Sequence, residues 1–92
     1  MRVIEKKMIN AINSQSNFAL DNTTVQKIDD VNMAVYLHGN EIATVNSRTG
    51  FVMVNKVTLK QWPSNTTKSR LRALGMMVNT IKGQIFLNGV AL

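Results

Sequence analysis

The most constraining feature of the sequence is a strict alternation of side chains between residues 31 and 38. The apolar side chains at every second position are Val31, Met33, Val35 and Leu37. A period of two places alternate side chains on opposite faces of a β-strand, so this segment predicts a strand with one buried face. Gly39-Asn40 follows, and both residue types tolerate a positive φ, which predicts a tight hairpin into a second strand over 41–46.

Other segments extend this hairpin into a larger sheet and precede it with a helix. Residues 3–14 carry apolar side chains at helical spacing, which predicts an N-terminal amphipathic helix. Phe18–Leu20 is expected to return the chain to the core. Short strands are expected over 24–28 and 51–56, bounded by turn sequences, and give an antiparallel meander of about four strands.

The last third of the chain predicts a second helix and a hairpin. Pro63 and the polar residues after it are typical of a helix start, and the helix is expected from Thr66 onward. Its apolar stripe is Leu71, Leu74, Val78 and Ile81. Asn88-Gly89 predicts a turn within a C-terminal β-hairpin over 84–92. The predicted fold is one α+β domain over 1–92, with an N-terminal helix, the meander, a second basic helix and a C-terminal hairpin.

Composition excludes several ways of stabilising so short a chain. The 92 residues include no cysteine and one histidine, so disulfides, thiolate zinc sites and histidine metal clusters are excluded. Because a small core has a thin stability margin, self-association into a homodimer is the expected extra support. No apolar run is long enough to span a membrane, and the N-terminus lacks an apolar core of signal-peptide length.

Charge is divided sharply along the chain. All five acids lie within residues 1–41 with four bases, so this part carries a net charge of −1. Residues 42–92 contain no acid and carry +7, from Arg48, Lys56, Lys60, Lys68, Arg70, Arg72 and Lys82. Bases without local acids project a positive field, which favours nucleic acid or an acidic protein surface as the partner. The alternative is that the charge serves only solubility.

The second helix provides the main candidate contact. Lys68 and Arg72 lie four residues apart on the face opposite the apolar stripe, with Arg70 at its flank. Arg48, Lys56 and Lys60 are expected to extend this basic surface over the sheet. Two aromatic side chains are candidate stacking contacts, Trp62 and Tyr36. Because Pro63 follows Trp62, we expect Trp62 to be a core anchor between the sheet and the helix, with base stacking as the alternative. The helix bases can equally form a solvated face.

The sequence offers little for catalysis. His38 follows a strand beside a glycine, and general base catalysis would require a pocket and a partner for it. Asp29-Asp30 is typical of a turn, and neighbouring strand side chains point to opposite faces rather than toward one metal ion. We therefore expect no enzymatic activity, no cofactor and no metal.

Three sequence strings resemble a known family. VYLHGNEIATV over 35–45, Trp62 followed by NTTKSRLRALG over 65–75, and KGQIFLNG over 82–89 resemble small accessory proteins of tailed lytic bacteriophages. The resemblance covers about residues 6–89 and is most specific over 62–74. It carries over no activity, but implies expression from a phage accessory gene in the host bacterial cytoplasm.

The residues and the resemblance together predict a binding protein. The expected function is a non-enzymatic phage accessory protein that binds and inhibits or redirects a host protein or nucleoprotein complex, such as a nucleic-acid-handling anti-phage defence complex. The alternative is direct binding of phage or host DNA or RNA. Steep salt dependence would indicate nucleic acid, whereas a protein interface would keep an apolar centre and survive moderate salt.

Overall fold

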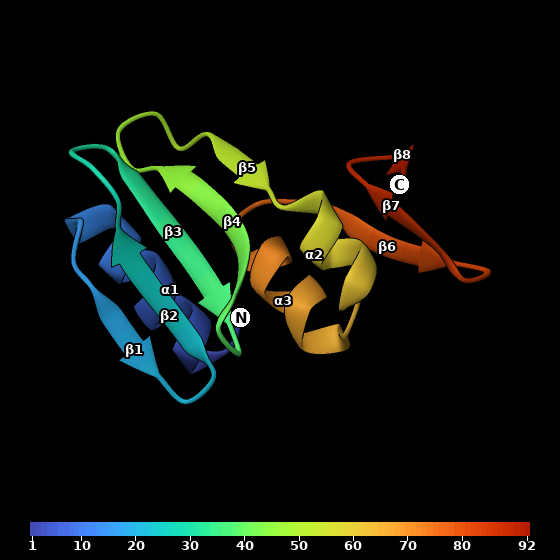
Figure 1. Ribbon diagram of the computed structural model, residues 1–92, viewed down its shortest axis with the longest axis horizontal. Helices are drawn as coiled ribbons and strands as arrows, with labels where there is room; N and C mark the ends of the chain where they lie inside the picture. The colour runs from blue at the N-terminus through green and yellow to red at the C-terminus, as the bar shows by residue number, and fades with distance from the viewer.

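The computed structural model describes residues 1–92 and confirms the predicted α+β class. The helices are α1 (Val3–Ser14), α2 (Lys56–Gln61) and α3 (Asn65–Ala73). The strands are β1 (Phe18–Leu20), β2 (Thr23–Lys27), β3 (Asn32–Leu37), β4 (Asn40–Asn46), β5 (Val52–Val54), β6 (Val78–Ile81), β7 (Gln84–Leu87) and β8 (Val90–Ala91). They form a five-stranded antiparallel sheet, ordered β1-β2-β3-β4-β5, and a three-stranded sheet, ordered β6-β7-β8 (Figure 1).

Helix α1 lies against one face of the five-stranded sheet (Figure 1). Its buried apolar residues, Met8, Ala11 and Ile12, recur at helical spacing and join one core with Val25 and Val35 of the sheet. This confirms the N-terminal amphipathic helix predicted over 3–14. None of the three helices is long and apolar enough to cross a membrane.

Strand β3 has the buried face that its alternation predicts. Met33, Val35 and Leu37 are all buried, whereas Tyr36 on the other face is half-buried. Ala34 shares the face of Tyr36 and is nevertheless fully buried, because its methyl group lies between the larger neighbours Gln26 and Thr44 on the adjacent strands. The face of the sheet opposite α1 therefore carries mostly uncharged polar side chains and is not covered by a helix.

A register shift in the β3–β4 pair adds one buried residue to the core. Val35 pairs with Ala43, but Tyr36 pairs with Glu41, so Ile42 has no partner across the ladder. Such a β-bulge turns two successive side chains to the same side. Ile42 and Ala43 are accordingly both buried.

The hairpin before this bulge turns one residue earlier than the sequence predicts. His38 and Gly39 both have positive φ, 52° and 79°, and Asn40 already begins β4. Two left-handed residues match the tight turn that the twist of a hairpin prefers. The hairpin is confirmed, and its turn is His38-Gly39 rather than Gly39-Asn40.

Helix α2 replaces the predicted end of the strand over 51–56. Strand β5 stops at Val54, and the Asn55 side chain accepts a hydrogen bond from the Thr58 backbone N–H at 3.1 Å. This is an N-terminal cap, and it begins a helix of only six residues whose buried side chain is Leu59. The six residues are too few for a periodic pattern to be recognised.

Helix α3 is shorter than the apolar stripe predicts. It ends at Ala73 because Gly75 takes a left-handed φ of 94°, with hydrogen bonds from Gly75 N–H to Arg72 O and from Met76 N–H to Leu71 O. This arrangement is a Schellman motif, which satisfies the last helical carbonyls. The predicted stripe is therefore wrong beyond Leu74, and its last two members, Val78 and Ile81, belong to strand β6.

The predicted C-terminal hairpin is confirmed and gains a third strand. Strands β7 and β8 pair across the Asn88-Gly89 turn, and β6 pairs with β7 across Lys82-Gly83. Val78 and Leu87 join the main core, while the β6–β7 hairpin extends away from the five-stranded sheet (Figure 1).

Candidate functional site

Arg70, predicted to belong to a basic surface, is one of the most buried polar residues of the protein. Its exposed fraction is 2%, and its Nη1 lies 2.8 Å from Oε2 of Glu5 in α1. The guanidinium also donates to Thr23 Oγ1 at 3.0 Å and to Asn22 Oδ1 at 3.3 Å. The prediction is wrong because Arg70 shares the face of α3 that carries buried Leu71 and contacts the sheet and α1.

Glu5 is the buried partner of Arg70, and the sequence around it does not indicate this pairing. Burial raises the pKa of Glu5, but its hydrogen bonds and the charge of Arg70 outweigh burial and hold the pKa below its usual range. The carboxylate accepts hydrogen bonds from Ser69 Oγ at 2.5 Å, from the Arg2 backbone N–H at 3.1 Å and from Arg70. The carboxylate is ionised at neutral pH and connects α1 to α3. The signal available in the sequence was a single acid among the apolar positions of the first helix.

The remaining bases of α3 are only partly free. Arg72 is exposed, yet its Nε and Nη2 donate to the Val78 carbonyl at 3.0 and 2.6 Å, which ties α3 to β6. Lys68 is half-buried. Of the three predicted bases, Arg70 is therefore a core residue and Arg72 joins α3 to β6. Lys68 is left as the available cation of this helix.

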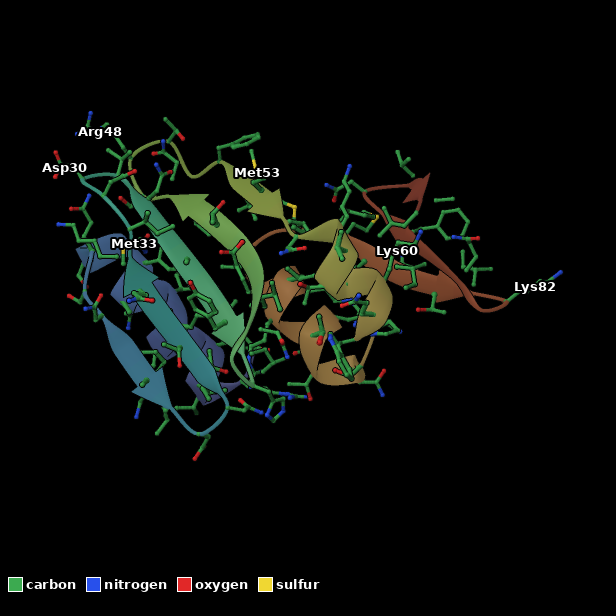
Figure 2. All side chains as sticks on the ribbon, viewed as in Figure 1. Asp30, Met33, Arg48, Met53, Lys60 and Lys82 are labelled. Carbon is green, nitrogen blue, oxygen red and sulfur yellow. The ribbon has the colours of Figure 1, made fainter.

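The other predicted bases are exposed but do not form one patch. Arg48 lies at one end of the molecule, as does Asp30, and Lys82 lies at the tip of the β6–β7 hairpin at the other end (Figure 2). Lys60 lies between them, near the end of α2. The Arg70–Glu5 pair is the single salt bridge of the structure, so none of these bases forms a salt bridge with an acid. The positive charge is spread along the long axis of the molecule.

Exposed apolar side chains accompany the bases of one segment. Phe51, Met53 and Val57 are each more than 60% exposed, and Lys56 and Lys60 lie in the same stretch of chain. We call this surface the β5–α2 edge, defined by Phe51, Met53, Lys56, Val57 and Lys60. Figure 2 shows Met53 and Lys60 along this side of the molecule. Large apolar groups left in water beside unpaired cations are typical of a contact surface.

Trp62 lies at the edge of a cleft rather than in the core. Its exposed fraction is 58%, so the predicted core anchor is wrong. The cleft has a volume of about 620 Å³ and separates the β3–β4 turn from the α2–α3 corner. Its lining residues are Leu37, His38, Asn40, Ile42, Thr58, Gln61, Trp62, Pro63, Ser64, Thr66 and Thr67.

Tyr36, the second predicted stacking residue, is not part of this cleft. It precedes cleft residue Leu37 in β3, so its side chain points to the opposite face of the sheet, in line with Thr24 and Glu41 on the adjacent strands. The structure therefore does not bring Tyr36 and Trp62 together.

The candidate acids and the histidine have the surroundings of turn residues. Asp29 accepts hydrogen bonds from the Asn32 side chain and from the backbone N–H groups of Val31 and Asn32, and these bonds lower the pKa of Asp29. His38 lies in the hairpin turn and lines the cleft. No three metal-ligating side chains lie close together.

Fold and surface define a small α+β protein with exposed bases, one apolar and basic edge and one half-open cleft. Over residues 1–91 the chain matches the model of the Kyanoviridae Gp96 protein, and it therefore belongs to this phage protein family. The expectation of a phage protein is confirmed at that level. Neither a curated protein nor a solved structure matches the chain.

Proposed function

We propose that this phage protein is a non-enzymatic accessory protein that binds a host protein or nucleoprotein complex in the infected cell and so inhibits or redirects it. The observation that carries the proposal is the β5–α2 edge, where Phe51, Met53 and Val57 are exposed beside unpaired bases. Protein interfaces combine an apolar centre with a polar rim, and charges on the rim select a complementary partner.

The charges of this edge specify the partner's chemistry. Lys56 and Lys60 are both exposed, and no acid occurs after Glu41 in the sequence. An acidic protein surface with an apolar centre fits such an edge. A nucleoprotein complex, such as a nucleic-acid-handling anti-phage defence complex, also offers apolar protein surface beside negative charge.

Capture of partners from host lysate, with and without nuclease, tests the proposal. Phe51→Ala is expected to reduce capture at least tenfold, because apolar interface anchors carry much of the binding energy. The matched control is Ile28→Ala, which removes an apolar side chain that is 55% exposed in the β2–β3 connection. Equal capture by both variants would refute the β5–α2 edge as the contact.

A charge comparison separates a local contact from the overall field. Lys56→Glu with Lys60→Glu lowers the net charge by as much as Lys6→Glu with Lys7→Glu, which changes exposed positions of α1. Only the first pair is expected to abolish capture. If both pairs weaken capture equally, the overall positive field is responsible and the β5–α2 edge is not.

Direct binding of DNA or RNA remains the second candidate, favoured by the exposed indole of Trp62 together with the positive field. It predicts capture that is lost after nuclease treatment and an affinity that falls steeply with salt. The protein-binding proposal predicts capture that survives both treatments.

A further inference from the structure

The Trp62 cleft has the size and the shape of a ligand site. Its volume of about 620 Å³ lies within the range of roughly 300–1,000 Å³ that small-molecule sites occupy. Leu37 and Ile42 are buried core residues that also line the cleft, while Trp62 and Pro63 line it from the α2–α3 corner. Apolar side chains on one side of the cleft and the indole on the other can pack against a flat ring.

The polar groups of the cleft narrow the ligand class. Apart from His38, every lining side chain is uncharged at all ordinary pH values, and no Lys, Arg, Asp or Glu is among them. Asn40, Gln61 and Thr66 make no side-chain hydrogen bond within the protein, so their donors and acceptors are available. A carboxylate, a phosphate or a metal ion would find no counter-charge here, whereas a planar, uncharged and polar ring would find both donors and acceptors.

The backbone of Trp62 is fixed at the end of α2, and its side chain extends into solvent at the cleft. The Trp62 backbone N–H donates to Thr58 O at 2.8 Å at the end of α2, and the following Pro63 restricts the backbone of Trp62. Exposed aromatic side chains act as platforms on which nucleobases stack. Trp62 thus presents an exposed indole from a restricted backbone position at the rim of the cleft.

We propose that the Trp62 cleft binds one unpaired nucleobase, stacked on the indole, from a nucleotide or a single strand. Residues 42–92 contain no acid, so phosphates attached to the ligand outside the cleft would lie in a positive field. This field favours a nucleotide over a neutral sugar as the ligand. Lys60 and Lys68 directly adjoin the lining residues Gln61 and Thr67 in sequence. Lys60 also belongs to the β5–α2 edge, so the two proposals are separated by Trp62, which lines the cleft, and Phe51, which does not.

Trp62 is the only tryptophan of the chain, so its fluorescence reports on this cleft alone. The probes are adenosine monophosphate, an eight-residue single-stranded oligothymidylate, a blunt duplex and the neutral sugar maltotriose. We expect saturable quenching by the mononucleotide, the single strand or both, and none by duplex or sugar. Equal affinity for the first two indicates a free nucleotide as ligand, whereas tighter binding of the strand indicates single-stranded nucleic acid.

Variants then localise the binding, measured by anisotropy of a labelled oligothymidylate and by calorimetry with the mononucleotide. Trp62→Ala is expected to weaken binding by about tenfold or more, the loss typical of a removed stacking platform, and Trp62→Phe to retain most of it. Phe51→Ala removes an exposed aromatic ring outside the cleft and is expected to change nothing. No quenching at millimolar nucleotide, quenching by maltotriose alone, or equal losses in Trp62→Ala and Phe51→Ala would overturn the proposal. Phe51→Ala is also the variant expected to reduce capture of the host protein. The two variants therefore test the two proposals separately.

Discussion

Replacing Arg70 by alanine tests the buried pair that joins the first helix to α3. The side chains of Arg70 and Glu5 are each 3% exposed, and their closest atoms are 2.8 Å apart. Removing one partner of a buried ion pair leaves an uncompensated charge, which costs about 3–5 kcal/mol. A chain of this length has a total stability of roughly 5–14 kcal/mol at about 0.05–0.15 kcal/mol per residue, so the loss is a large part of it.

Each single variant leaves a different group unpaired. In Arg70→Ala, Glu5 keeps hydrogen bonds from Ser69 and from the Arg2 N–H, whereas Glu5→Ala leaves a buried guanidinium with only Thr23 and Asn22 as acceptors. Both variants are expected to fall in the range of about 3–5 kcal/mol. The double variant Glu5→Leu with Arg70→Met removes both charges and is expected to be far closer to the wild type.

Urea denaturation followed by circular dichroism measures these free energies of unfolding. Arg72→Ala is the matched control, because Arg72 is exposed and its loss removes hydrogen bonds to one carbonyl oxygen only. A cost for Arg70→Ala no greater than that for Arg72→Ala would refute the buried pair. A double variant as unstable as the sum of the two single variants would refute the coupling between them.

Three further outcomes are expected. The folded-state pKa of Glu5 is below its ordinary value of 4.5, so the stability that its ionised form contributes is present above pH 4.5 and is lost as the pH falls through the lowered pKa. The urea midpoint of the wild type should therefore drop on acidification, and the midpoint of Glu5→Gln should drop less. Val35→Asp places an unpaired charge in the core and should cost several kcal/mol in a thermal melt, whereas Ala34→Ser, on the uncovered face, should cost far less. If a homodimer supports the small core, the melting temperature should rise with protein concentration, and a concentration-independent melt of a monomer would contradict self-association.

Elements with a local cause were predictable from the sequence. The alternation of β3 and the helical spacing in α1 are patterns within a dozen residues, and burial in the structure follows them. Gly75 was also visible as a helix stop, but the spacing of Val78 and Ile81 imitated a continuing helix. The bulge at Ile42 depends on the pairing of two strands and has no local signature.

The candidate site was less predictable, because side-chain exposure depends on partners distant in sequence. The sequence placed Arg70 only at the flank of the basic face, and its full burial depends on Glu5, 65 positions away. Trp62 beside Pro63 resembles a core anchor, and its exposure follows from the unpredicted helix α2, which ends at this residue. The cleft is formed by two segments that the sequence does not show to be neighbours.

The Arg70–Glu5 pair also affects the order in which the chain can fold during synthesis. Residues 1–54 contain α1 and all five strands of the larger sheet, so most partners of the core leave the ribosome early. Until α3 is made, Glu5 lacks the hydrogen bonds from Ser69 and Arg70 that stabilise its carboxylate. The contact between α1 and α3 can form only after residue 70 has emerged, which couples the first-made helix to nearly the last quarter of the chain.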